Sequence, residues 1–275
     1  MHDRLSIHAV CFPGAGLREL AGYWRELGAQ RVSLASNLLL EEGLPAAQEA
    51  LRESHCTVES ITHPFLAGRH LEQREESWRD ARGTLTRLIQ TAKCLGAHSI
   101  YMLTGGHGSL TWEEAAEVFS MAIAPCVVEA KEAGIALMVE NSAALYADIH
   151  IAHTLRDAIT LAEVAGVGVC IDLFACWAEA GLRESIGRAV PGCHLVQVCD
   201  YVYGDRSLPS RAVPGEGAIP VKRILEWTLQ AGYTGTFDIE LVGPRIDAEG
   251  RVTAVRRSAD ILGETLQELL DGLRR

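Results

Sequence analysis

The sequence predicts an α/β protein, a single (β/α)8 TIM barrel in which residues 1–275 form one domain. Three observations predict this fold. Short apolar, β-branched runs alternate with longer amphipathic stretches, and there are eight such runs. The length of 275 residues matches the roughly 250 residues of a typical barrel of this kind. No flexible linker, block of like charges or low-complexity tract divides the chain.

The eight apolar runs are the predicted strands, at residues 5–12, 31–36, 57–63, 99–103, 136–140, 168–172, 195–199 and 236–241. Strands that alternate with helices run parallel and are joined by crossover helices. Eight units favour closure into a barrel. An open dinucleotide-binding sheet would need a glycine-rich phosphate loop after the first strand. The sequence there, Pro13-Gly14-Ala15-Gly16, lacks the third glycine, so this alternative is disfavoured.

Start and stop signals of helices separate the runs. Residues 111–114 (TWEE) form a capping box that should open a helix ending near Ala133. Pro125 inside this helix predicts a kink or a break. Pro220 suits the first turn of the helix that precedes the eighth strand. Glycines that precede five of the strands match helix ends, namely Gly28, Gly96, Gly134, Gly166 and Gly232.

Composition excludes several classes of partner. A formal net charge of −11 leaves no basic footprint for nucleic acid. No run approaches the about 18 consecutive apolar residues of a membrane span, and the first apolar run is too short for a secretory signal. We therefore expect a cytoplasmic protein without a membrane partner. No pair of the eight cysteines is spaced Cys-x-x-Cys, so we expect buried free thiols and no cysteine-ligated zinc.

Oxygen-bearing side chains end four successive predicted strands. Glu140 and Asp172 end the fifth and sixth runs, and Gln197 and Glu240 lie near the ends of the seventh and eighth. In a parallel barrel these ends meet at one rim, where catalytic groups gather. Converging buried carboxylates repel one another, and a divalent cation relieves both the repulsion and the cost of desolvation. Taken singly, each acid could instead be an unrelated loop or helix-cap residue.

The order of short motifs resembles the sugar-phosphate isomerase/epimerase superfamily, the xylose-isomerase-like TIM barrels. The matching stretches are 136–141 (ALMVEN), 169–172 (VCID), 196–200 (VQVCD), 213–217 (VPGEG), 231–235 (AGYTG) and 238–240 (DIE). Relatives in this superfamily include hydroxypyruvate isomerase, ketose 3-epimerases, inosose dehydratase and 3-dehydroshikimate dehydratase. The resemblance implies one divalent metal ion, Mn²⁺ first and Mg²⁺, Co²⁺ or Zn²⁺ as alternatives, bound by Glu140, Asp172, Gln197 and Glu240.

The resemblance also implies individual roles. Glu140 and Glu240 would double as acid and base, and Arg211 would hold the substrate. Relatives often carry histidine three residues after the aspartate of the sixth strand. The residue here is Ala175, which weakens the assignment as an isomerase.

Other side chains are candidates for substrate contact, each weighed against a structural role. They are His63 at the end of the third strand, His107 in a glycine-rich loop after the fourth, and Trp177. We expect Asn141 to orient Glu140. We expect His8 to be a core residue, and His150 and His153 to lie on the surface.

These residues predict a divalent-metal-dependent isomerase or epimerase of a small sugar, sugar derivative or hydroxy-keto acid, acting through a metal-stabilised enediolate. A metal-dependent lyase or dehydratase of the same superfamily shares the first step and stays open. The alternative from another class is a non-catalytic barrel that acts as a binding partner. Abasic-site DNA cleavage would need more histidine ligands and a basic groove. The expected partner is a small-molecule substrate, and a homo-oligomer is open.

Overall fold

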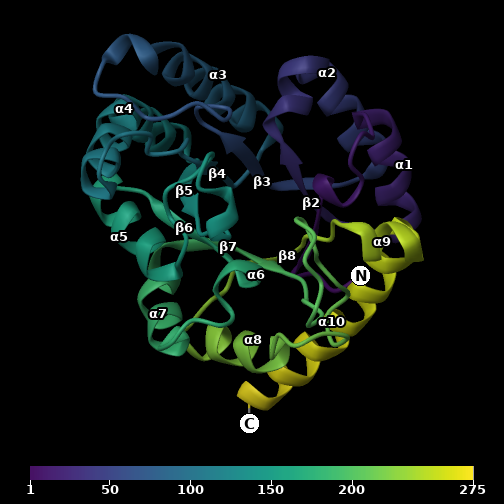
Figure 1. Ribbon diagram of the computed structural model, residues 1–275. Helices are drawn as coiled ribbons and strands as arrows, with labels where there is room; N and C mark the ends of the chain where they lie inside the picture. The colour runs from purple at the N-terminus through teal and green to yellow at the C-terminus, as the bar shows by residue number, and fades with distance from the viewer. Residues whose placement is uncertain (275) are drawn as a thin grey trace.

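The computed structural model describes residues 1–274 and contains a closed barrel of eight parallel strands paired in chain order (Figure 1). Strand β8 closes the barrel against β1, with Leu5 beside Phe237 and Ile7 beside Ile239. The predicted fold class is therefore confirmed. The strands are β1 (Leu5–His8), β2 (Arg31–Ala35), β3 (Thr57–Pro64), β4 (Ser99–Leu103), β5 (Ala136–Glu140), β6 (Gly168–Asp172), β7 (Cys193–Val198) and β8 (Thr236–Ile239).

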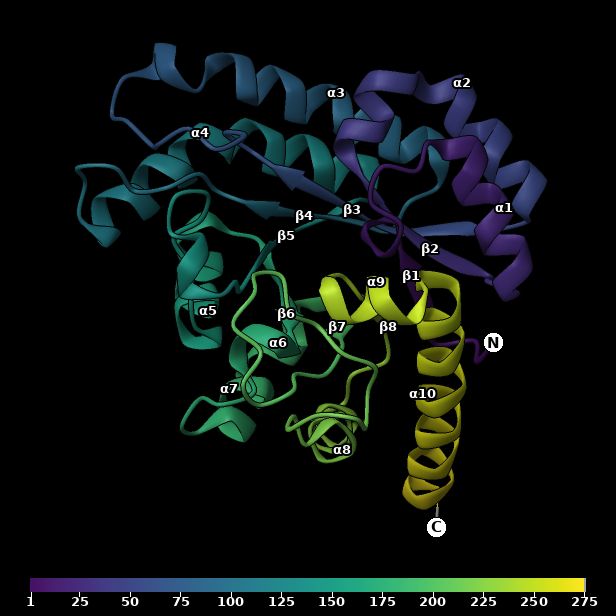
Figure 2. The same cartoon turned by 45° about the vertical axis from the view of Figure 1, so that its right-hand side comes forward.

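Helices form a ring around the barrel (Figure 1). The longest, α10, packs against α1 and α8 and so completes the ring, as its course beside the barrel in Figure 2 illustrates. The helices are α1 (Leu17–Leu27), α2 (Ser36–Ser54), α3 (Arg79–Leu95), α4 (Trp112–Ala133), α5 (Leu155–Ala165), α6 (Leu173–Cys176), α7 (Leu182–Ala189), α8 (Val221–Gln230), α9 (Pro244–Glu249) and α10 (Arg251–Leu273). In the part of the chain that the structure describes, no helix combines the length and apolarity that a membrane crossing requires.

The predicted starts and ends of the helices hold, whereas the chain does not break at Pro125. Helices α1, α3, α4 and α5 end at glycines with left-handed backbone, where the missing Cβ removes the steric penalty. The Thr111 hydroxyl accepts a hydrogen bond from the Glu114 backbone N–H, and the Glu114 carboxylate accepts one from the Thr111 N–H. Helix α4 runs through Pro125 without a break. Arg82 of α3 donates to the carbonyl of Met121, the group that the missing Pro125 N–H leaves open (3.0 Å).

Strand ends differ from the predicted ones by a few residues. Strand β1 ends at His8 because Ala9–Cys11 form a 3-10 turn, whose Val10 N–H donates to His8 Nδ1 (2.9 Å). Strand β8 ends at Ile239, so Glu240 lies just past it, at the rim of the barrel. Seven of the eight cysteines are buried free thiols as expected, and Cys94 is exposed.

Candidate active site

A pocket of about 260 Å³ opens at the carboxyl ends of the strands. Larger hollows lie on the outer surface, such as one of about 470 Å³ beside α1 and α10, whose described lining holds one carboxylate, Glu19. The polar side chains that line the rim pocket are His8, Thr62, Tyr101, Glu140, Ser142, Tyr146, Asp172, Arg211 and Glu240. The barrel therefore brings together charged residues that are up to 100 positions apart in the chain, from Glu140 to Glu240.

The guanidinium of Arg211 lies between two of the carboxylates. Its Nη1 donates to Asp172 Oδ1 (3.0 Å) and its Nη2 donates to Asp172 Oδ2 (2.8 Å). Nη2 also lies 3.1 Å from Glu240 Oε1. The Arg211 backbone N–H donates to the Val242 carbonyl (3.1 Å), which ties the loop after β7 to the loop after β8. The Phe174 ring lies 5.0 Å from the guanidinium carbon and covers it.

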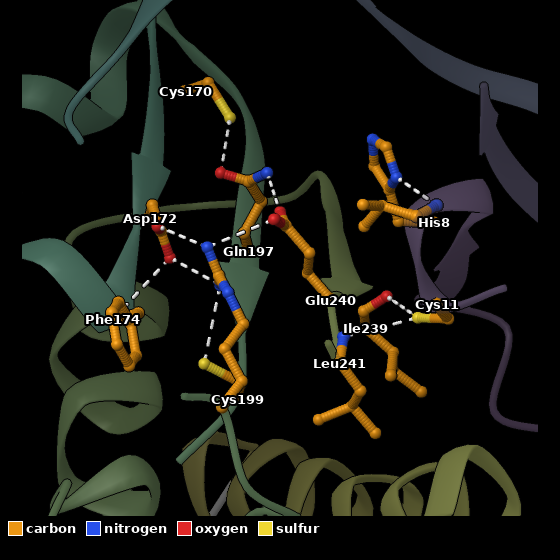
Figure 3. A network of polar contacts seen from close by, with 12 residues as sticks. His8, Cys11, Cys170, Asp172, Phe174, Gln197, Cys199, Ile239, Glu240 and Leu241 are labelled. Atoms are coloured by element: carbon orange, nitrogen blue, oxygen red, sulfur yellow. Dashed lines mark hydrogen bonds and ion pairs between the residues drawn. The ribbon is translucent and has the colours of Figure 1, made fainter. Parts of the chain in front are cut away.

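Asp172, Gln197 and Glu240 point toward one another from β6, β7 and the end of β8 (Figure 3). Gln197 Nε2 donates to Glu240 and also to Tyr101 Oη (3.1 Å). Burial lowers the pKa of His8 to about 3, so its ring is neutral. Because His8 Nδ1 accepts from Val10, the ring proton sits on Nε2 and donates to Tyr101 Oη (2.9 Å). This network holds the Gln197 amide in one place.

The three carboxylic acids differ in their surroundings. Burial raises the pKa of Glu140 well above its ordinary value, and repulsion from Glu240 and Asp172 adds to the shift. No described residue donates a hydrogen bond to the Glu140 carboxylate. Burial also raises the pKa of Asp172, to about 6, and that of Glu240, while the positive charge of Arg211 opposes both shifts. The single positive charge of Arg211 thus balances three carboxyl groups, and the charge of Glu140 is the one that it compensates least.

Two further side chains support these acids. Asn141 exchanges two hydrogen bonds with the backbone of Asp172, at 2.9 and 3.0 Å, so it orients Asp172 and not Glu140 as we expected. The expectation that His150 lies on the surface is wrong. Its Nε2 donates to the Glu140 carbonyl (2.7 Å), and it is fully buried. Its isoleucine neighbours, Ile149 and Ile151, were the available signal of burial.

The remaining candidates lie outside the pocket. His63 faces outward from β3, where its Nδ1 lies 3.0 Å from the Ser36 hydroxyl at the start of α2. His107 is exposed on the loop after β4. Trp177 stacks at a tilt on Tyr201, with ring centroids 6.3 Å apart. Ala175 does not line the pocket, and the preceding Phe174 does.

The structure also reveals site residues that sequence reasoning missed, chiefly Tyr101, Phe174 and Tyr146, together with a pocket-facing position for His8. Tyr101 carries a hydroxyl between the apolar residues Ile100 and Met102 of β4, and that was the signal available for it.

The oxygen-bearing side chains of Glu140, Asp172, Gln197 and Glu240 are of the type that binds divalent ions. In the described conformation they do not surround a common point. Within residues 1–274, no three His, Cys, Asp or Glu side chains are grouped closely enough to coordinate a metal. The Arg211 guanidinium stands between Asp172 and Glu240, and the Gln197 amide nitrogen faces Glu240. Yet three buried carboxyl groups with raised pKa values surround a single positive charge, which is an environment that favours additional cationic charge.

A sequence model of the xylose isomerase-like TIM barrel family matches residues 23–265. The chain belongs to this family. No curated protein sequence matches it significantly. Among solved structures, protein SMc04130 from Sinorhizobium meliloti 1021 is similar, with 22% identity, a TM-score of 0.80, and coverage of 97% of this chain and 98% of that one.

Two further solved structures are similar to this chain. The IOLI protein with a bound zinc atom has 15% identity, a TM-score of 0.80, and coverage of 97% of this chain and 99% of that one. The 3-keto-D-glucoside 4-epimerase YcjR from E. coli has 16% identity, a TM-score of 0.75, and coverage of 94% and 98%. At these identities the likeness establishes the shared xylose isomerase-like fold.

Proposed function

We propose that this protein is a divalent-metal-dependent isomerase or epimerase that moves a proton beside the carbonyl group of a small hydroxy-keto substrate. One observation carries the proposal: Glu140 and Glu240, from the two strands that flank β6 and β7, line the same pocket around Asp172 and Arg211. The zinc atom of the similar IOLI structure and the epimerase activity named for YcjR support it.

Glu140, Asp172, Gln197 and Glu240 would hold the metal ion. A bound divalent ion supplies Lewis-acid chemistry, because it polarises a carbonyl oxygen and stabilises the negative charge that develops there. Oxygen donors of this kind suit Mn²⁺, with Mg²⁺, Co²⁺ or Zn²⁺ as alternatives.

The two glutamates are suited to different halves of the proton transfer. Glu240 lies 3.1 Å from Arg211, whose charge favours the ionised carboxylate, so Glu240 is the base that removes the proton. Glu140 lacks a cationic contact and burial raises its pKa well above its ordinary value, which suits it to the role of the acid that returns a proton. The positive charge of Arg211 stabilises the ionised carboxylate of Glu240, and the Phe174 ring shields the guanidinium from water.

The test begins with elemental analysis of the purified protein and a screen of keto-sugars, inososes and keto acids with mass detection. An isomerase conserves substrate mass, whereas a dehydratase product lacks one water. On a substrate found in this way, Glu240→Gln should abolish both turnover and deuterium uptake from D₂O. Glu140→Gln should abolish turnover but retain deuterium uptake, because the base alone can exchange the proton.

Glu59→Gln is the matched control, since Glu59 is a buried glutamate paired with Arg31 outside the pocket (3.0 Å). It should leave turnover within about twofold of the wild type. Near-normal turnover in either Glu140→Gln or Glu240→Gln removes that residue from the acid/base pair. A protein that neither contains nor binds a divalent metal overturns the proposed function.

A further inference from the structure

The walls of the rim pocket differ in character from its charged floor. Aliphatic and aromatic side chains from separate segments at the rim of the barrel form them, and each is only partly buried in the protein. These side chains are Val10, Leu103, Ile149, Phe174, Pro209 and Val242. Partly exposed apolar side chains that face one another across a pocket form a surface that water solvates poorly and that an apolar ligand covers favourably.

The polar groups that the pocket offers a substrate lie at a few points, which are the hydroxyls of Thr62, Tyr101, Ser142 and Tyr146 and the charged groups of the floor. Tyr101 Oη accepts hydrogen bonds from His8 and Gln197, which leaves its own O–H as one donor. The Ser142 hydroxyl is the one buried oxygen of the lining that has no hydrogen-bond partner among the described residues. Arg211 is the single arginine or lysine among the described lining residues, and its Nη atoms contact Asp172 and Glu240. A phosphate group would therefore find no cationic side chain that is free of a carboxylate partner in the described lining.

An aromatic row continues from the pocket to the surface. Phe174 of the lining contacts Tyr201 edge-on, with ring centroids 6.0 Å apart. Tyr201 contacts Trp177 and Tyr203, each at 6.3 Å between centroids. Tyr203 at the end of the row is 74% exposed. The apolar character of the wall thus extends outward over the loops that follow β6 and β7.

We propose, resting on the proposed function, that the substrate is an uncharged hydroxyketone with an apolar ring or branched hydrocarbon body. The hydroxyketone end would contact the floor formed by Glu140, Asp172 and Glu240, and the body would contact the walls. A polyol or a sugar phosphate fits less well, because hydroxyls buried against aliphatic walls lose their hydrogen bonds to water without replacement. The volume of about 260 Å³ exceeds the roughly 150 Å³ of a cavity that binds benzene, so it accommodates a substituted ring.

The experiment measures binding of defined probes by calorimetry. Mn²⁺ alone is titrated first, and the Mn²⁺-loaded protein then receives 2-hydroxyacetophenone, D-fructose or dihydroxyacetone phosphate. We expect 2-hydroxyacetophenone to bind at least about tenfold more tightly than either sugar-like probe. Acetophenone, which lacks the hydroxyl, should bind at least about tenfold more weakly than 2-hydroxyacetophenone.

A matched pair of variants tests the wall itself. Val242→Thr changes one methyl group of the wall to a hydroxyl and should weaken 2-hydroxyacetophenone binding about fivefold or more without altering Mn²⁺ affinity. Val164→Thr makes the same change at an exposed site on α5 and should have no effect.

Preference for fructose or the phosphate, equal affinities across the probes, or equal binding of acetophenone each overturns the substrate inference. In those cases Mn²⁺ binding leaves the proposed function standing. If Mn²⁺ does not bind, Mg²⁺, Co²⁺ and Zn²⁺ are titrated in its place, and absence of binding by all four ions overturns the proposed function and the inference with it.

Discussion

The contact that Arg211 makes with Asp172 and Glu240 allows a quantitative test of the site, independent of any substrate. Arg211→Met keeps most of the apolar stem and removes the positive charge. In the wild type the guanidinium makes two hydrogen bonds to Asp172, at 3.0 and 2.8 Å, and lies 3.1 Å from Glu240. Arg211 is 7% exposed and Asp172 is 2% exposed, so water cannot replace the lost charge.

Breaking a buried ion pair by removing one partner costs about 3–5 kcal/mol. The loss should depend on pH. The folded-state pKa of Asp172 is already raised from 3.8 to about 6, so folding stability falls as pH rises through this interval. Without Arg211 the pKa of Asp172 rises further, and the decrease in folding stability extends to higher pH. At pH 8 we therefore expect a loss of about 3 kcal/mol or more, and at pH 5 clearly less, because protonated carboxyl groups need no cation.

Urea unfolding followed by circular dichroism at pH 5 and pH 8 measures both values. Arg245→Met is the matched control, because Arg245 makes a partly exposed ion pair with Asp205 (3.2 Å). Pairs of that kind contribute about 0–1 kcal/mol. A variant Arg211→Met within about 1 kcal/mol of the wild type at pH 8 would refute the reasoning, and so would an equal loss at both pH values.

Two further predictions concern neighbouring residues. Burial raises the pKa of Asp238 from 3.8 to about 8, so the folded protein holds this proton while the unfolded chain loses it, and stability falls as pH rises from about 4 to 8. Asp238→Asn keeps an oxygen for the hydrogen bond from Ser6 and should raise the free energy of unfolding at pH 9 by about 2–5 kcal/mol; a less stable variant in urea unfolding contradicts this account. Gln197→His should retain Mn²⁺ binding in calorimetric titration, because imidazole suits the same ions; loss of the ion counts against Gln197 as a ligand.

Much of the candidate site is readable in the sequence because strand ends are local features. An apolar run that stops at an acid or amide marks the rim of a parallel barrel, and this places Glu140, Asp172, Gln197 and Glu240 together without knowledge of the loops. Helix boundaries are readable for the same reason, since Gly28 and Thr111 act on their own neighbours in the chain.

The direction in which each strand side chain points could be determined only from the closed barrel. His63 and Thr62 are adjacent in β3, yet Thr62 lines the pocket and His63 faces α2, because successive side chains of a strand point to opposite faces. When a strand is apolar along its whole length, its sequence does not reveal which set of alternate positions faces the barrel interior.

The sequence by itself determined the fold, the family and the acids at the rim, because each depends on periodicity or on residues close together in the chain. Only the tertiary structure decided that Arg211 lies between Asp172 and Glu240, that His8 holds Tyr101, and that the walls of the pocket are apolar. Those facts depend on loops that meet only when β8 closes against β1, and contacts made across such distances leave no local pattern.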